Sequence, residues 1–180
     1  TGDTWTLIKK LNDICFNKLF MMTILYKSTN QYIYSGTGFW LTNYIENILG
    51  ISNPYSKLYS YIIIIVVGPT VGMFFGGIVG SMLGGYEKKN SIFAILIFQR
   101  ISTFLGIFIP IAQNFKIFVL FFTLFNTFSS AVVPINTGLI LWSVPKNIKG
   151  LANGTSSLVT TILGKLPSPF IYGYLQHNFS

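Results

Sequence analysis

Five stretches of the sequence are apolar over the length that a bilayer-spanning helix requires, about 20 residues. Polar segments separate them, and they cover about residues 19–44, 60–85, 91–112, 115–144 and 151–174. The runs are continuously apolar and do not alternate with a period of two, so they predict helices and not the strands of a transmembrane barrel. The pattern therefore predicts an all-α integral membrane protein, a polytopic transmembrane helix bundle over residues 19–176.

The connections between these stretches are short. The longest covers about residues 45–59, where Asn53-Pro54 predicts a turn. Residues 1–18 are expected to form a linker before the first span, and residues 177–180 follow the fifth span.

Composition supports this class. Charged residues make up 9% of the 180 residues, against roughly 25% in soluble domains. Apolar residues reach 51%, and the mean hydropathy is +0.59. A soluble domain could not cover its surface with so few charges, and a disordered chain would need fewer apolar residues.

The net charge of +8 comes from scattered cations, so it does not indicate a nucleic-acid partner. Cytoplasmic loops of membrane proteins carry an excess of Lys and Arg. One side would hold Lys9, Lys10, Lys18, Lys88, Lys89, Lys146 and Lys149, and the other Lys57 and Lys116. The asymmetry predicts a cytoplasmic N-terminal segment, cytoplasmic loops at Lys88 and Lys146, and residues 177–180 on the opposite side.

Glycines recur at every fourth position of the second span. They are Gly68, Gly72, Gly76, Gly80 and Gly84. Such a stripe lets a neighbouring backbone approach closely, which is how membrane helices associate. The spacing predicts tight packing and leaves open whether the surface is static or slides during a change of shape.

Three cations fall within the predicted spans: Lys27, Arg100 and Lys165. A charge at mid-membrane costs at least about 2.5 kcal/mol and normally faces a protein interior or a wet cavity. Lys27 also has the alternative of extending to the cytoplasmic interface. No acid lies in a span core, so the counter-charge would be an anionic ligand, backbone carbonyls or an acid elsewhere.

Polar residues recur at three- and four-residue steps in three spans, which places each set on one helix face. The sets are Thr23, Lys27, Gln31 and Tyr34; Thr123, Asn126, Ser130 and Thr137, with Asn136 close by; and Asn153, Ser157, Thr160 and Gly164. Interhelical hydrogen bonds and a shared central cavity both explain such faces.

Prolines lie within or at the ends of the spans, most densely at Pro167 and Pro169. Each removes a backbone donor and can kink its helix. Broken helices at membrane depth are typical of transporter sites and gates, although static kinks are an equal alternative.

The sequence contains no catalytic motif. It has no phosphate-binding glycine loop, a single histidine, His177, and a single cysteine, Cys15. We therefore expect neither an enzyme nor a metal site nor a cofactor.

The order of these features resembles the second half of a major facilitator superfamily transporter. Residues 36–44 are similar to the end of that fold's seventh helix, and residues 77–89 to its short cytoplasmic loop motif. Gly77, Gly84, Lys88 and Lys89 fit the motif, whereas Ser81 stands where an aspartate is expected and Met82 where an arginine is common. Residues 134–136, 144–145 and 150–173 are similar to the spinster-like branch.

The resemblance implies helices seven to eleven, with the first half and the twelfth helix absent from this sequence. It implies an alternating-access transporter that works in the lipid bilayer on a small organic solute, anionic or lipid-like. The cavity candidates are Lys27, Gln31, Arg100, Asn126, Asn136 and Lys165. The alternative is a structural or receptor-like membrane protein that transports nothing.

Overall fold

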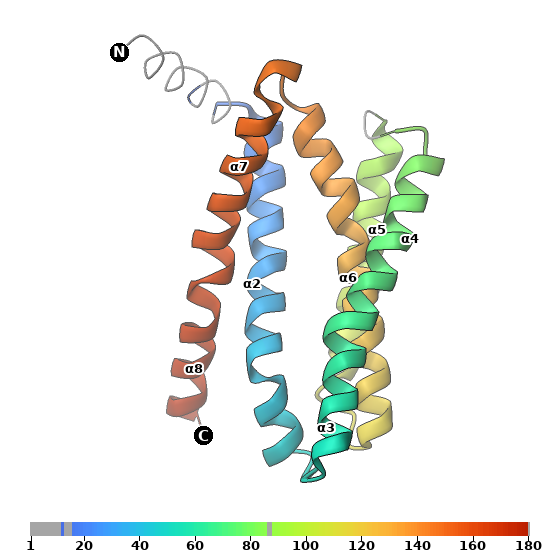
Figure 1. Ribbon diagram of the computed structural model, residues 1–180, viewed down its shortest axis with the longest axis vertical. Coiled ribbons are helices and arrows are strands. Elements are labelled where there is room, and N and C mark those ends of the chain that lie inside the picture. Colours follow the sequence, from blue (N-terminus) through green and yellow to red (C-terminus); the bar gives the residue numbers. More distant parts are fainter. Residues whose placement is uncertain (1–11, 13–15, 86–87, 180) are drawn as a thin grey trace. The chain divides into compact units, whose positions relative to one another are not determined.

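The computed structural model describes residues 12, 16–85 and 88–179, and every regular element in them is a helix (Figure 1). The predicted all-helical class is therefore confirmed for these residues. The elements are α2 (Lys18–Asn47), α3 (Pro54–Tyr61), η1 (Ile62–Val67), α4 (Gly68–Met82), α5 (Lys89–Phe108), α6 (Phe115–Trp142), η2 (Lys146–Ile148), α7 (Lys149–Thr160), η3 (Thr161–Lys165) and α8 (Pro167–Phe179). Most of the expected linker over residues 1–18 lies outside the described residues.

Three continuous helical segments are long and apolar enough to cross a membrane. They are Pro54–Met82, Lys89–Phe108 and Phe115–Trp142. The other two predicted spans are helical too, in α2 and in the succession of α7, η3 and α8, but they contain more polar residues.

Asparagines set where several helices begin. Asn53 accepts a hydrogen bond from the backbone N–H of Tyr55, and Pro54 occupies the first turn of α3. The second apolar segment therefore begins at residue 54, before the expected residue 60, and the loop expected over residues 45–59 shrinks to about residues 48–53. Asn17 and Asn114 cap α2 and α6 in the same way.

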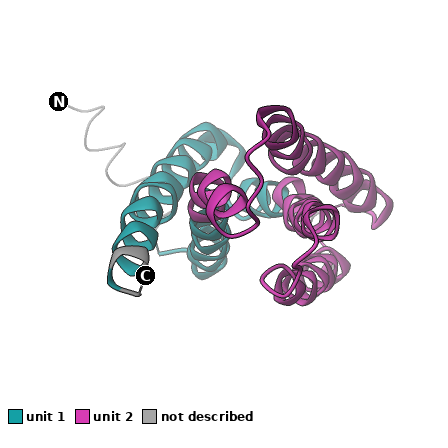
Figure 2. Cartoon of the chain, turned by 90° about the horizontal axis from the view of Figure 1, so that it is seen from below, with its two compact units in different colours: residues 1–35, 136–180 teal, residues 36–135 magenta. Residues whose placement is uncertain are grey.

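The chain forms two compact units (Figure 2), whose boundaries fall within α2 and α6. Unit 1 is residues 1–35 with 136–180, and unit 2 is residues 36–135.

The core of unit 1 joins the start of α2 to the end of α6 and the start of α7. Its buried side chains are Phe20, Ile24, Ile140, Val144, Ile148 and Ala152. Asn17 adds a polar tie, because its Nδ2 donates to the backbone oxygen of Ser143 at 2.7 Å while its Oδ1 caps α2.

In unit 2 the glycine stripe of α4 lies against the backbone of α6. A Cβ added at Gly68 would lie 3.1 Å from the carbonyl oxygen of Thr123, and at Gly72 and Gly76 it would collide with the carbonyls of Thr127 and Ala131. Each four-residue step on α4 is matched by a four-residue step on α6, so the two helices run parallel.

Gly80 is also buried, whereas Gly84 leaves the expected stripe. Gly84 follows the end of α4 and has φ of 80°, a left-handed conformation that glycine adopts without steric cost. Its role is therefore in the turn and not in the helix contact.

Large apolar side chains point outward from α4 and α5. They include Val71, Phe74, Ile78, Met82, Phe93, Leu96 and Ile107. The buried face of α4 holds glycines, and the hydrogen-bonding residues Ser91 and Ser102 of α5 and Asn126 of α6 are each at most 1% exposed. This distribution fits a protein surrounded by lipid, where small and polar residues mediate helix contacts.

We expect Gly76→Ala to destabilise unit 2 by about 1–3 kcal/mol, because the new methyl group would overlap the α6 backbone. The neighbouring Gly77→Ala is the matched control, since a Cβ there meets nothing within 4 Å. Unfolding of the detergent-solubilised protein by denaturing detergent, followed by circular dichroism, measures both. Equal stability of the two variants would contradict the close contact.

Candidate functional site

Buried polar groups of unit 1 gather where α2 lies beside α7. The Nζ of Lys27, a half-buried residue, lies 3.4 Å from the Oγ of Ser156, which is fully buried. Ser28 and Thr160 are 4% and 6% exposed, and neither hydroxyl has a hydrogen-bond partner within the described chain. We name Lys27, Ser28, Ser156 and Thr160 the polar seam. It offers one cation and two unpaired hydroxyls inside one unit.

Glycine allows the helices to approach beside this seam. A Cβ added at Gly164 would lie 2.5 Å from the backbone oxygen of Ser28 and 3.2 Å from the Cβ of Gln31. The structure therefore brings Gln31, predicted as a cavity residue, against η3 and next to the polar seam.

The buried face of the fifth predicted span differs from the expected one. Asn153 and Ser157 are exposed. The buried positions recur at every fourth residue: Ala152, Ser156, Thr160, Gly164 and Ser168. An α-helix advances 400° over four residues, so such a stripe drifts by 40° a step. The wider i→i+5 turn of η3 takes more residues per turn and rotates the stripe back toward α2.

Two π-turns precede prolines in this chain. In η3 the N–H of Leu166 donates to the oxygen of Thr161, five residues back, and Pro167 follows. In η1 the N–H of Gly68 donates to the oxygen of Ile63, and Pro69 follows. In each case the next donor of the ladder is missing, because proline has no N–H.

A side chain from a neighbouring helix replaces the donor that is missing at Pro69. At the first break, position 69 would donate to the oxygen of Ile64, and the Nδ2 of Asn126 donates to that oxygen instead, at 3.0 Å. Asn126 is 1% exposed, and its Oδ1 has no partner among the described residues.

The second break is in unit 1, where a further proline, Pro169, follows two residues after Pro167. Pro169 cannot donate to the oxygen of Lys165, four residues back, and the Oγ of Ser35 donates to it at 3.2 Å. The Oγ of the intervening Ser168 donates to the oxygen of Tyr32 at 2.5 Å. Pro167 and Pro169 thus lie where two side-chain hydrogen bonds join α2 to the end of η3 and the start of α8.

Asn136 also joins helices within unit 1. It is 3% exposed, and its Nδ2 donates to the backbone oxygen of Thr23 at 3.3 Å. For Asn126 and Asn136, the structure therefore favours interhelical hydrogen bonding, one of the two explanations that their polar faces allowed.

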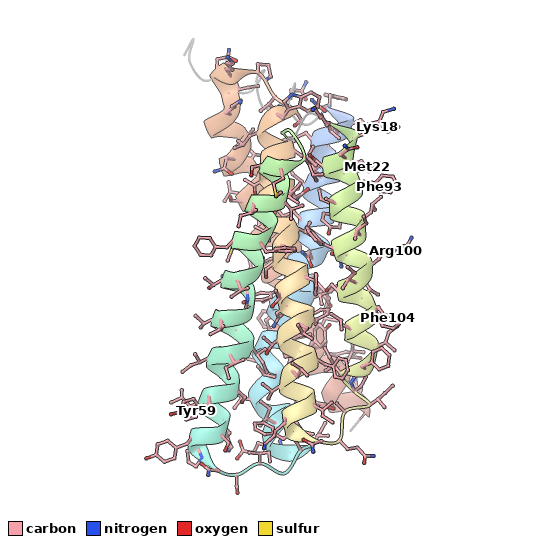
Figure 3. All side chains as sticks on the ribbon, turned by 90° about the vertical axis from the view of Figure 1, so that its right-hand side faces the viewer. Lys18, Met22, Tyr59, Phe93, Arg100 and Phe104 are labelled. Carbon is pink, nitrogen blue, oxygen red and sulfur yellow. The ribbon has the colours of Figure 1, made fainter. Side chains whose placement is uncertain are left out.

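The other two cations of the predicted spans, Arg100 and Lys165, have exposed side chains. Lys165 takes part in the helix contact through its backbone only, and Arg100 extends from the outer side of α5 (Figure 3). Of the six cavity candidates, Lys27 and Gln31 lie together. Asn126 and Asn136 form hydrogen bonds between helices. Arg100 and Lys165 line no buried site in the described chain.

Acidic groups are scarce around these cations. Glu46 is the acid that the structure describes, and its carboxylate pairs with Lys57 at 3.0 Å. Glu87 lies outside the described residues. Within the described ranges no three His, Cys, Asp or Glu side chains gather into a possible metal site.

The sequence patterns missed Ser28, Ser35, Ser156 and Ser168. A search for small residues four apart, continued from Gly164 in both directions, would have found Ser156 and Ser168. Ser28 and Ser35 carry no such signal, because their roles depend on which helix lies opposite.

No protein-family model, curated protein or solved structure matches this chain.

We expect Asn126→Ala to cost about 1–3 kcal/mol of stability, because it leaves the Ile64 carbonyl unpaired in the protein interior. Adding Pro69→Ala restores a backbone donor, so the cost of Asn126→Ala should fall by about 0.5 kcal/mol or more in that background. Denaturing-detergent titrations of the four proteins measure this double-mutant cycle.

Asn136→Ala is the control for this cycle, because its partner oxygen, that of Thr23, follows no proline. Its cost should be the same with Pro69 and with Ala at that position. Purely additive effects of Asn126→Ala and Pro69→Ala would refute the replacement of the missing donor.

Proposed function

We propose that this protein is a membrane transporter that moves a small organic solute with an anionic group by alternating access. The observation that carries the proposal is Lys27. Its ammonium group is half-buried within a unit, contacts a serine hydroxyl at 3.4 Å, and has no acidic partner among the described residues. A cation kept in such a place favours an anionic ligand.

The hydroxyl groups near Lys27 are also suited to binding an anion. The hydroxyls of Ser28 and Thr160 are buried and unpaired, and each can donate one hydrogen bond. A carboxylate, sulfonate or phosphate oxygen accepts such bonds and pairs with an ammonium group, and charge-assisted hydrogen bonds are the stronger kind. The solute we favour is therefore an organic anion, which includes lipid-like molecules with an anionic head.

The broken helices support a change of shape. Transporters bind their substrates near helices that are interrupted within the membrane, and rocking of helix bundles exposes the site to each side in turn. Here η3 and the two following prolines interrupt the helix that faces Lys27. Tight small-residue contacts would let such helices shift as rigid pieces.

The proposal extends to the whole transporter. We place the chain in the second half of a major-facilitator-like protein of the spinster-like branch, preceded by a bundle of six helices, with its Lys88 and Lys146 loops in the cytoplasm. The competing proposal, a helix bundle that transports nothing, predicts no uptake of any solute.

We expect Lys27→Gln to reduce uptake of an organic anion by about tenfold or more, because the only charge of the polar seam is lost. Lys27→Arg should retain much of the uptake. The measurement is uptake into liposomes by the reconstituted full-length protein, using matched pairs of solutes such as a carboxylate and its neutral amide.

Lys116→Gln is the control, because that lysine is exposed at the start of α6. It should leave uptake unchanged, and Arg100→Gln and Lys165→Gln measure whether the other two intramembrane cations contribute. Unchanged anion uptake by Lys27→Gln would sink the proposed site, and no uptake of any solute by the wild-type protein would favour the non-transporting alternative.

A further inference from the structure

Arg100 lies in the middle of an exposed apolar surface of α5. Phe93 is 67% exposed, Ile97 50% and Phe104 61%, and Arg100 is exposed between them. Steps of three and four residues place all four on one helix face. Figure 3 shows Phe93, Arg100 and Phe104 on the outer side of α5. We name these four residues the Arg100 face.

The position of Arg100 makes its charge costly. The 20 residues of α5 match the thickness of the hydrocarbon core, and Arg100 is the twelfth of them. It lies about 16 Å along the axis from Lys89 and about 12 Å from Phe108. Long cationic side chains escape to the interface only near helix ends, so this guanidinium group needs a partner at its own depth.

The described chain offers no such partner. The segments α4, α5 and α6 contain no acid, and Glu46 is already paired with Lys57. A second copy of the chain would bring another Arg100 to a symmetric contact, where two like charges repel. The missing charge must therefore come from a different chain or segment.

We propose that the Arg100 face binds a transmembrane helix of a partner protein that carries an aspartate or glutamate at the depth of Arg100. The carboxylate forms a bidentate ion pair with the guanidinium group, and apolar side chains of the partner pack on Phe93, Ile97 and Phe104.

The adjacent surface suits a docked helix. A groove of about 350 Å³ between α4 and α5 is lined by Val79 and Leu83 together with Phe93 and Ile97 of the Arg100 face. It accepts a large apolar side chain of the partner helix one turn or two from the ion pair. This inference is independent of the proposed transport function, because it uses no residue of the polar seam.

The test uses synthetic transmembrane helices of about 20 leucine and alanine residues. One carries a single central aspartate, and the others carry leucine or lysine there. Their binding to the full-length protein is measured by energy transfer in phosphatidylcholine vesicles. We expect the aspartate peptide to bind about tenfold tighter than the leucine peptide, and the lysine peptide to bind weakest.

Variants of the protein assign the preference to Arg100. Arg100→Leu should abolish the preference for aspartate, and Arg100→Lys should retain part of it. Arg100→Gln repeats the test should the leucine variant lose helical circular dichroism. Phe104→Ala should weaken all peptides and keep the preference. Lys165→Leu removes the other exposed intramembrane cation and should change nothing.

Two results would overturn the proposal. One is equal binding of the aspartate and leucine peptides to the wild-type protein. The other is loss of the aspartate preference when the vesicles also contain an anionic phospholipid, because lipid headgroups would then be the partner of Arg100.

Discussion

In a bilayer every backbone carbonyl must find its hydrogen-bond donor within the protein, because hydrocarbon supplies none. Prolines make this requirement acute, since each removes one donor from its helix. At Pro69 the oxygen of Ile64 receives the amide of Asn126, and at Pro169 the oxygen of Lys165 receives the hydroxyl of Ser35. These hydrogen bonds join α6 to η1 in unit 2 and α2 to η3 in unit 1.

Glycine and serine then determine how close those neighbours come. A side-chain amide or hydroxyl reaches a carbonyl of the next helix only when the two backbones nearly touch. Gly72 and Gly76 allow that approach between α4 and α6, and Gly164 allows it between η3 and α2. The same small residues leave Lys27 beside hydroxyl groups instead of bulky apolar side chains. The polar seam thus lies beside the close contact of η3 with α2 at Gly164.

The three cations of the predicted spans, Lys27, Arg100 and Lys165, lie in three different environments. The cost of a cation in lipid depends on its depth and on whether its side chain reaches the interface. Lys27 is half-buried beside Ser156, Lys165 engages α2 through its backbone oxygen, and Arg100 extends from α5 between exposed phenylalanines. All three are cations, yet only Lys27 contacts a buried hydroxyl through its charged group.

Some structural features of this protein follow from local sequence alone. Apolar length predicts the helices, because a helix satisfies its own backbone in lipid, and four-residue glycine spacing predicts a face for close contact. Other features depend on which helix lies opposite. Asn126 and Asn136 give the same sequence signal along α6. In the structure the Nδ2 of Asn126 donates to the oxygen of Ile64 at a proline break, whereas the Nδ2 of Asn136 donates to the oxygen of Thr23. In the fifth predicted span the sequence pattern favours Ser157, whereas the structure buries Ser156 and leaves Ser157 exposed. The spacing of residues along a helix is a property of one chain segment. A hydrogen bond between helices needs two segments, and only the tertiary structure brings the second segment beside the first.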